Sequence, residues 1–160
     1  MEVERRVKEI TAKDAAERLE MLCSKREICI SQAEEKLRKW GLAPEAWDSI
    51  VNTLVNNRYI DNRRFAIAFA RDKFRFNKWG PQKIRMQLLA KHIDAEYIVE
   101  ALLEVNPNEL PVSIIKELER KATSVKAKSA YELRMKLIAI GVRKGFSYDL
   151  VARAVSQILG

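Results

Sequence analysis

The side chains best suited to chemistry in this sequence are arginines and lysines, and they gather in the middle of the chain. Residues 63–91 hold nine basic side chains against one acidic side chain, Asp72. Residues 116–144 hold nine basic and three acidic side chains, whereas residues 1–60 hold eleven of each. Guanidinium and ammonium groups bind phosphates and carboxylates, so this uneven charge indicates a polyanionic partner or an acidic protein surface. A solvated helix face is the alternative.

Ten basic residues make up the predicted binding surface. They are Arg64, Arg71, Lys73, Arg75, Lys78, Lys83, Arg85, Lys91, Arg134 and Lys136. The four between residues 71 and 78 are the strongest candidates, because few acidic residues lie close in sequence to pair with them. For Arg85 and Arg134, a solvated position or a contact between helices is an equal alternative to partner binding.

The sequence contains no recognisable catalytic or metal-binding constellation. It has no phosphate-binding loop, no glycine-rich dinucleotide fingerprint and no nucleophile elbow. His92 is the only histidine, and no motif places a serine and an aspartate around it. Cys23 and Cys29 are expected to be ordinary helix residues rather than metal ligands or a disulfide. We therefore expect a non-enzymatic protein with no metal and no cofactor.

The sequence also lacks membrane and export signals. No apolar run reaches the roughly 18 residues that a membrane span needs. The charged N-terminal stretch contains no apolar core of the kind found in signal peptides. We expect a cytoplasmic protein without a membrane partner.

The elements that must position the basic residues are short helices, because apolar residues recur with helical spacing and strand patterns are scarce. The pattern predicts helices near residues 13–26, 31–40, 44–57, 62–76, 81–91, 95–105, 111–123, 129–140 and 147–159. Helix start signals support these positions. They are two capping boxes, Ser31 with Glu34 and Ser129 with Glu132; two N-caps, Asp61 and Asp94; and two first-turn prolines, Pro44 and Pro81.

The helices fall into three groups of three, and an internal repeat connects the groups. Segments 32–42, 83–93 and 132–142 share apolar columns: Ala33, Ile84 and Leu133; Leu37, Leu88 and Leu137; Leu42, Ile93 and Val142. Such units bury their apolar stripes by stacking on their neighbours. The sequence therefore predicts an all-α, elongated array of three tandem three-helix repeats. The expected boundaries are an N-terminal extension at 1–12 and repeats at 13–60, 61–106 and 107–160.

The middle repeat is similar to the RecX family. The segment from Tyr59 to Ile93 contains the aromatic–apolar–Asp start, the Phe-Ala pair, the Arg-rich helix and the Gly-Pro step of that family. The matching residues are Tyr59, Ile60, Asp61, Phe65, Ala66, Arg71, Gly80, Pro81, Ile84, Arg85, Leu88, Lys91 and Ile93. We expect Asp61 to cap a helix, Phe65 to lie in the core, and Gly80 with Pro81 to set a turn. His92 departs from the family, which usually has glycine there, so the left-handed helix cap is in question at this position.

The resemblance implies a modulator, usually an inhibitor, of the RecA recombinase. Family members are understood to lie along the groove of the RecA filament on single-stranded DNA, where they limit its extension or promote its disassembly. They thereby suppress strand exchange, ATP hydrolysis and co-protease activity, which connects them with recombination, DNA repair and the SOS response. The implied partners are RecA, its filament and single- or double-stranded DNA, and we expect a monomer.

The alternative function is direct DNA binding by helix-turn-helix-like repeats, since both functions use short helices and clustered basic residues. The sequence leaves open whether the basic surface contacts DNA or RecA.

Overall fold

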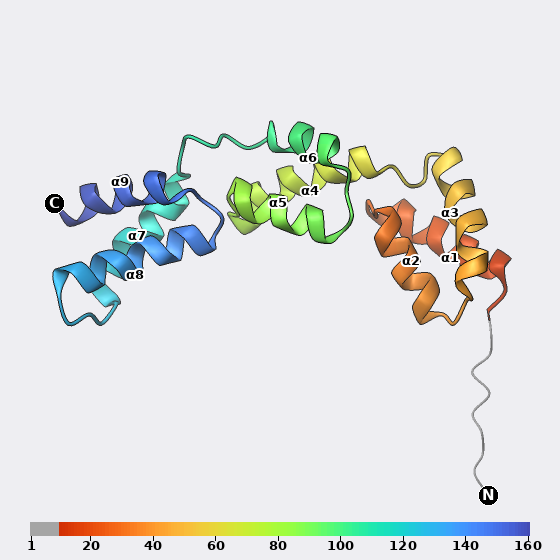
Figure 1. Ribbon diagram of the computed structural model, residues 1–160, viewed down its shortest axis with the longest axis horizontal. Coiled ribbons are helices and arrows are strands. Elements are labelled where there is room, and N and C mark those ends of the chain that lie inside the picture. The colour runs from red at the N-terminus through yellow and green to blue at the C-terminus, as the bar shows by residue number, and fades with distance from the viewer. Residues whose placement is uncertain (1–9) are drawn as a thin grey trace, which may run out of the picture. The chain divides into compact units, whose positions relative to one another are not determined.

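The computed structural model describes residues 10–160, and all regular structure in that range is helical (Figure 1). The helices are α1 (Ala12–Lys25), α2 (Ile30–Lys39), α3 (Trp47–Asn56), α4 (Asn62–Asn77), α5 (Pro81–Ala90), α6 (Ala95–Leu102), α7 (Val112–Ser124), α8 (Ala130–Arg143) and α9 (Tyr148–Leu159), with one 3₁₀ turn, η1 (Pro44–Ala46). The predicted all-α class is confirmed. No helix within residues 10–160 is long and apolar enough to cross a membrane.

The helix starts follow local hydrogen bonding, and one predicted start is wrong. Ser129 Oγ accepts the N–H of Glu132 at 3.1 Å at the start of α8, but the Glu132 carboxylate accepts the N–H of Lys128 instead of that of Ser129, so only half of this predicted capping box is formed. The predicted capping box of Ser31 with Glu34 is not formed. Instead Cys29 is the N-cap of α2, and its N–H donates to Gln32 Oε1 at 3.2 Å. Ser31 lies inside α2, where its hydroxyl is free to donate to the backbone carbonyl of Lys91 at 2.8 Å.

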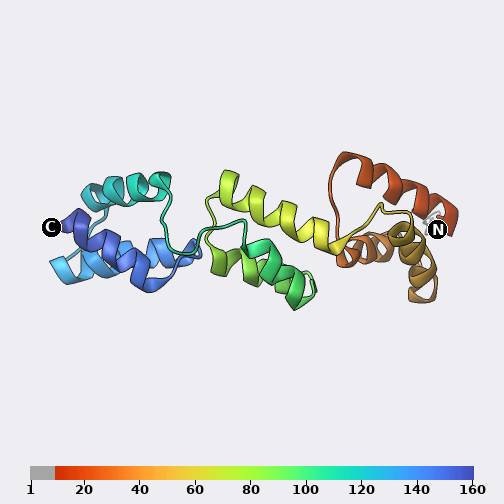
Figure 2. The same ribbon diagram turned by 90° about the horizontal axis from the view of Figure 1, so that it is seen from above.

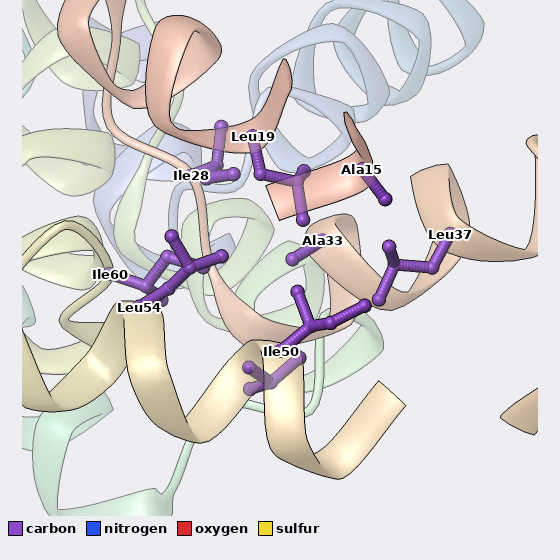
Figure 3. Packing of buried hydrophobic residues seen from close by; sticks show 9 residues of the cluster. Ala15, Leu19, Ile28, Ala33, Leu37, Ile50, Leu54 and Ile60 are labelled. Atoms are coloured by element: carbon purple, nitrogen blue, oxygen red, sulfur yellow. The ribbon is translucent and has the colours of Figure 1, made fainter. Parts of the chain in front are cut away.

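Two compact units can be distinguished. The first contains the described residues up to Phe65 together with Lys91–Ile93. Its core is aliphatic and is drawn from α1, α2 and α3 and from the segments that follow α1 and α3. Figure 3 shows this core, which includes Ala15, Leu19, Ile28, Ala33, Leu37, Ile50, Leu54 and Ile60. Each buried Leu or Ile stabilises the fold by about 1.5–3 kcal/mol relative to exposure, so this cluster holds the first three helices together.

The second unit contains Ala66–Ala90 and Asp94–Gly160. Within it α7, α8 and α9 contact one another, and α5 contacts α6 (Figures 1 and 2). The core of the last three helices is Leu110, Ile114, Leu118, Leu137, Ile138, Phe146, Val151 and Val155, and Phe74 of α4 packs against it. The helices thus follow the predicted tandem three-helix order.

Two glycines let two turns of the second unit touch through their backbones. The N–H of Gly80 donates to the carbonyl of Lys144 at 2.7 Å, and the N–H of Gln82 donates to the carbonyl of Gly145 at 3.0 Å. A Cβ on Gly80 would lie 2.5 Å from the carbonyl carbon of Gly145, which is closer than real Cβ contacts come. Gly80 therefore permits a close approach. In the turn between α4 and α5, the residue with a left-handed backbone conformation is Lys78, with φ 60°, and not Gly80.

In each group of three helices, a residue with positive φ follows the second helix, but this residue does not occupy the same repeat position in all three groups. His92 has φ 58°, so the cap that the sequence left in question is present without glycine. Gly41 occupies the corresponding place in the first repeat with φ 80°. In the third repeat, α8 continues through Gly141, which is buried against Val151, and the left-handed residue is Gly145 with φ 103°.

Candidate binding surface

Helix α4 presents basic residues on two opposite faces. Phe69, Lys73 and Phe76 are spaced i, i+4, i+7 and share one face. Arg71 and Arg75 lie on the other side of the helix. We call the first the Trp79 face, defined by Phe69, Lys73, Phe76, Trp79 and Lys83. We call the second the Arg71 face, defined by Arg71, Phe74, Arg75 and Lys78. The basic residues that are adjacent in sequence therefore do not form one continuous strip on α4.

On the Trp79 face, two ammonium groups converge on one indole ring. The Nζ of Lys73 lies 4.9 Å from the ring centroid of Trp79, and the Nζ of Lys83 lies 4.5 Å from it. Phe69 packs edge-on against Trp79, with centroids 6.2 Å apart, and also lies 5.5 Å from the Nζ of Lys73. Each cation–π contact is worth about 0.5–1 kcal/mol at an exposed site, so the ring orders both lysines.

On the Arg71 face, three cations surround a shallow hollow of about 350 Å³ that Phe74, Glu104 and Pro111 also line. Arg71 forms an ion pair with Glu104, Nη2 to Oε2 3.2 Å. Lys78 donates through Nζ to the backbone carbonyl of Arg75 at 2.6 Å. An exposed ion pair contributes about 0–1 kcal/mol, so Arg71 can exchange Glu104 for another anion at little cost.

Arg64 and Lys91 belong to the first unit. Arg64 pairs with Glu27, Nε to Oε1 2.8 Å, and donates from Nη2 to the carbonyls of Arg58 and Tyr59 at 3.2 Å each. Lys91 lies in the turn after α5, where its carbonyl accepts the Ser31 hydroxyl. Arg64 thus has a local structural role. Its ion-pair partner, Glu27, is distant in the sequence and could not be predicted from the residues next to Arg64.

Arg85, Arg134 and Lys136 lie on the later helices of the second unit. Arg85 borders a hollow of about 240 Å³ between α5 and α6 whose other lining residues are apolar, among them Leu89 and Val99. Arg134 donates from Nη1 to Ser156 Oγ at 2.5 Å, which joins α8 to α9. Lys136 pairs with Glu132, Nζ to Oε1 3.0 Å. The equivalent repeat positions 85 and 134 therefore have different surroundings.

The four residues assigned structural roles also have definite places. Asp61 Oδ1 accepts the N–H of Arg64 at 3.0 Å, at the start of α4. Phe65 is 5% exposed, and Pro81 is the first residue of α5. Gly80 provides the backbone contact with Gly145 described above.

The aromatic members of the Trp79 face were missed by sequence reasoning. The sequence analysis singled out none of Phe69, Phe76 and Trp79 as a binding residue. The available signal was the alternation of aromatic and basic residues from 69 to 79. Phe76 is 69% exposed, and the guanidinium of Arg75 lies 5.3 Å from its ring centroid.

No group of three or more His, Cys, Asp or Glu side chains within residues 10–160 is placed to hold a metal ion. Cys23 and Cys29 are free thiols. Burial, and then the neighbouring Glu27 carboxylate, raise the pKa of the Cys23 thiol. Cys29 is the buried N-cap of α2 rather than a residue within a helix, contrary to expectation. Its neighbour is Ser31 Oγ, 3.3 Å from its sulfur.

Comparison with known proteins places these helices in one family. The family model described as "RecX, second three-helix domain" matches residues 61–102, and "RecX, third three-helix domain" matches residues 113–155. The Regulatory protein RecX of Bacillus licheniformis is 29% identical over 126 residues, which are 79% of this chain and 48% of that protein. That of Bacillus cytotoxicus is 27% identical over 127 residues, covering 79% and 47%. The chain spans about half the length of these relatives.

Solved structures share the fold. The crystal structure of RecX from Lactobacillus salivarius superposes with a TM-score of 0.75 at 20% identity, covering 92% of this chain and 96% of that one. A second crystal structure, of a regulatory protein RecX, gives 0.77 at 23% identity and covers 91% and 71%. With two consecutive three-helix domains matched in order and the same fold in both structures, this chain belongs to the RecX family.

Proposed function

We propose that this chain is a non-enzymatic regulator of the RecA recombinase and acts as an inhibitor. It binds the RecA filament on single-stranded DNA and limits filament extension or promotes disassembly. Membership of the RecX family supports this proposal, and the relatives are named as regulatory proteins. The protein works in the cytoplasm as a monomer.

The observation that carries the proposal is the set of cations around α4 and α5, in the segment that matches the second RecX domain. Lys73, Arg75, Lys78 and Lys83 have no carboxylate within ion-pair distance among residues 10–160. Cations that the fold does not neutralise are available to an anionic partner, and the filament supplies both nucleic-acid phosphates and protein carboxylates.

The repeat organisation supports binding to a polymer. Each three-helix unit can contact a different site on a filament with modest affinity, and linked contacts raise the total affinity without a single tight site. The basic residues of the proposed binding surface are dispersed over α4, α5 and α8. Such an arrangement suits binding to a polymer better than binding to a small molecule in one pocket.

The second candidate function is direct DNA binding by helix-turn-helix-like repeats. The same unneutralised cations favour it, because contacts to phosphates dominate non-specific DNA affinity. In that case the protein binds naked DNA as tightly as it binds the filament.

A competition experiment separates the two functions. A fluorescently labelled RecA filament on single-stranded DNA is titrated with the protein, and naked single-stranded DNA of the same length serves as competitor. Filament regulation predicts tight binding to the filament and weak competition by naked DNA. Equal affinity for the two would favour direct DNA binding.

A further inference from the structure

The end of α4 exposes an aromatic ring among cations. Phe76 is 69% exposed and is not part of the apolar cores formed by α1–α3 and by α7–α9. Arg75 lies against the ring, and Lys73 is one turn earlier on the same face of the helix. A single exposed apolar side chain is common on protein surfaces, but an exposed aromatic ring among cations is also the arrangement with which proteins stack nucleic-acid bases.

Two lysines of the Trp79 face, Lys73 and Lys83, are held in position by an aromatic ring. Trp79 follows α4, and Lys73 and Lys83 reach it from α4 and α5. The indole ring therefore gathers two charges from two helices on one side chain. Long lysine side chains normally lose about 1.5–2 kcal/mol of rotamer freedom when they are ordered, and this cluster meets part of that cost before any partner arrives.

We propose that the Trp79 face is a binding site for single-stranded nucleic acid. In this site Phe76 stacks on a base, Lys73 and Lys83 bind the flanking phosphates, and Trp79 is a positioning residue for the two lysines. This inference rests on the proposed function, because it assigns the strand within the filament to this face and leaves Arg71 and Lys78 to the RecA protein, while Arg75, which lies 5.3 Å from the Phe76 ring, borders both faces.

The combination of groups favours a single strand over the other anionic partners. An acidic protein surface would pair carboxylates with the lysines and cover Phe76 with apolar side chains, and binding to such a surface would not depend on nucleic-acid bases. A duplex supplies phosphates, but its bases are already stacked on one another and paired. A single strand offers both phosphates and unstacked bases, which proteins bind with basic grooves and exposed aromatic side chains.

The test compares two ligands that differ only in their bases. Binding of the whole protein to labelled (dT)20 and to an abasic strand of the same length is measured by fluorescence anisotropy. The wild-type protein should prefer (dT)20. Phe76→Ala should weaken binding to (dT)20 by about fivefold or more, with little effect on the abasic strand, because only the first ligand can stack. Tyr131→Ala is the matched control, since Tyr131 is 72% exposed on α8, and it should leave both affinities unchanged.

Substitution of the two lysines should have a different effect on binding from substitution of Phe76. The double variant Lys73→Ala and Lys83→Ala should weaken binding to both strands and reduce the log–log salt slope by about 0.7 for each phosphate that is no longer neutralised. Trp79→Leu should reproduce part of this weakening with unchanged helical content, whereas Trp79→Phe, which keeps a ring, should restore affinity. Equal affinity of the wild type for the two strands, or an unchanged (dT)20 affinity in Phe76→Ala, would overturn the proposal.

The same variants measured against RecA ATPase distinguish this inference from the proposed function. If the protein inhibits RecA but binds (dT)20 and the abasic strand equally well, the nucleic-acid site is refuted and the regulatory function is not. If the protein binds (dT)20 more tightly than the abasic strand but does not affect RecA ATPase activity, the regulatory function is refuted and the nucleic-acid site is not.

Discussion

The basic side chains of α4 and α5 differ in what holds them. Arg71 has a carboxylate partner, Lys73 and Lys83 have an aromatic one, and the ammonium of Lys78 is held by a backbone carbonyl. On the proposed function, an anion of the partner would replace Glu104 at Arg71, whereas at Lys73 and Lys83 it would add to the contacts already present. The two faces of α4 should therefore respond differently to charge substitutions.

A carboxylate on α8 provides a test of local electrostatics. The backbone N–H of Lys128 and then the side chain of Lys136 lower the pKa of Glu132. A lowered pKa in the folded state means that the ionised carboxylate stabilises the fold above its ordinary pKa, and that this stabilisation is lost as the pH falls through the lowered value. Glu132→Gln should therefore lower the melting temperature at pH 7, and the difference from wild type should shrink in acid.

The control for this prediction is Glu119→Gln, which changes an exposed carboxylate on α7. Thermal unfolding followed by circular dichroism between pH 2 and pH 7 checks both variants. A Glu132→Gln effect that is the same at every pH would show that the ionised carboxylate is not the stabilising species.

The amino-acid sequence predicted that the proposed binding region is positively charged, but it did not predict which basic side chains share a face of α4. The ion pair of Arg71 with Glu104 and that of Arg64 with Glu27 each join residues more than thirty positions apart, so sequence neighbours gave no indication of either. Trp79 was missed because it follows α4, outside the helical spacing that relates Lys73 to Phe76. Only the turn between α4 and α5 brings its ring beside Lys73 and Lys83.

At the scale of elements, apolar spacing and start signals located the helices, whereas two of the helix ends depended on local turns or packing contacts that the spacing does not show. The predicted end of α6 was three residues too late, because residues 103–105 form tighter turns, such as the bond from Val105 N–H to the carbonyl of Leu102. The predicted end of α8 was three residues too early. Gly141 packs against Val151 there, and this contact favours continuing the helix.

The contact between the two glycine turns predicts a large effect from a small substitution. Gly80→Ala should destabilise the protein by roughly 3–5 kcal/mol, because overpacking costs about 1–3 kcal/mol and the two backbone hydrogen bonds about 1 kcal/mol each. Gly41→Ala is the control. Gly41 has a positive φ but no atom within 4 Å of an added Cβ, so this variant should be destabilised by only about 1–2 kcal/mol. Urea unfolding measures both, and equal destabilisation would contradict the close-approach role of Gly80.

The left-handed end of α5 predicts a stabilising substitution. His92 has φ 58°, a conformation that strains residues with a Cβ, so His92→Gly should raise the unfolding free energy by about 0.5–1 kcal/mol. Ala90→Gly, at the last residue of the same helix, should instead lower it by up to about 1 kcal/mol. Urea unfolding of the two variants checks the opposite signs, and a destabilised His92→Gly variant would show that its imidazole makes a necessary contact.

At the scale of the whole molecule, repeated helix order was a stronger guide than any single motif. The apolar columns predicted tandem three-helix units, and the RecX domain matches and the fold of solved RecX structures agree with them. Repeat boundaries stay predictions, because packing divides the described chain into two units and α4 begins in one and continues in the other. Identical apolar columns can stack in more than one way, so they do not specify such a division.

The most direct test of the account is RecA ATPase activity on single-stranded DNA, measured with increasing amounts of this protein. We predict that the wild-type protein inhibits ATP hydrolysis and has no ATPase activity of its own. The triple variant Arg71→Glu, Arg75→Glu and Lys78→Glu should inhibit much less, with helical content nearly unchanged, because exposed substitutions usually alter stability by about 0.5 kcal/mol or less. A control triple variant with the same charge change, Lys13→Glu, Arg26→Glu and Lys39→Glu, should inhibit like wild type. Unaltered RecA activity with the wild-type protein would contradict the regulatory function, and full inhibition by the first triple variant would contradict the placement of the binding surface on α4.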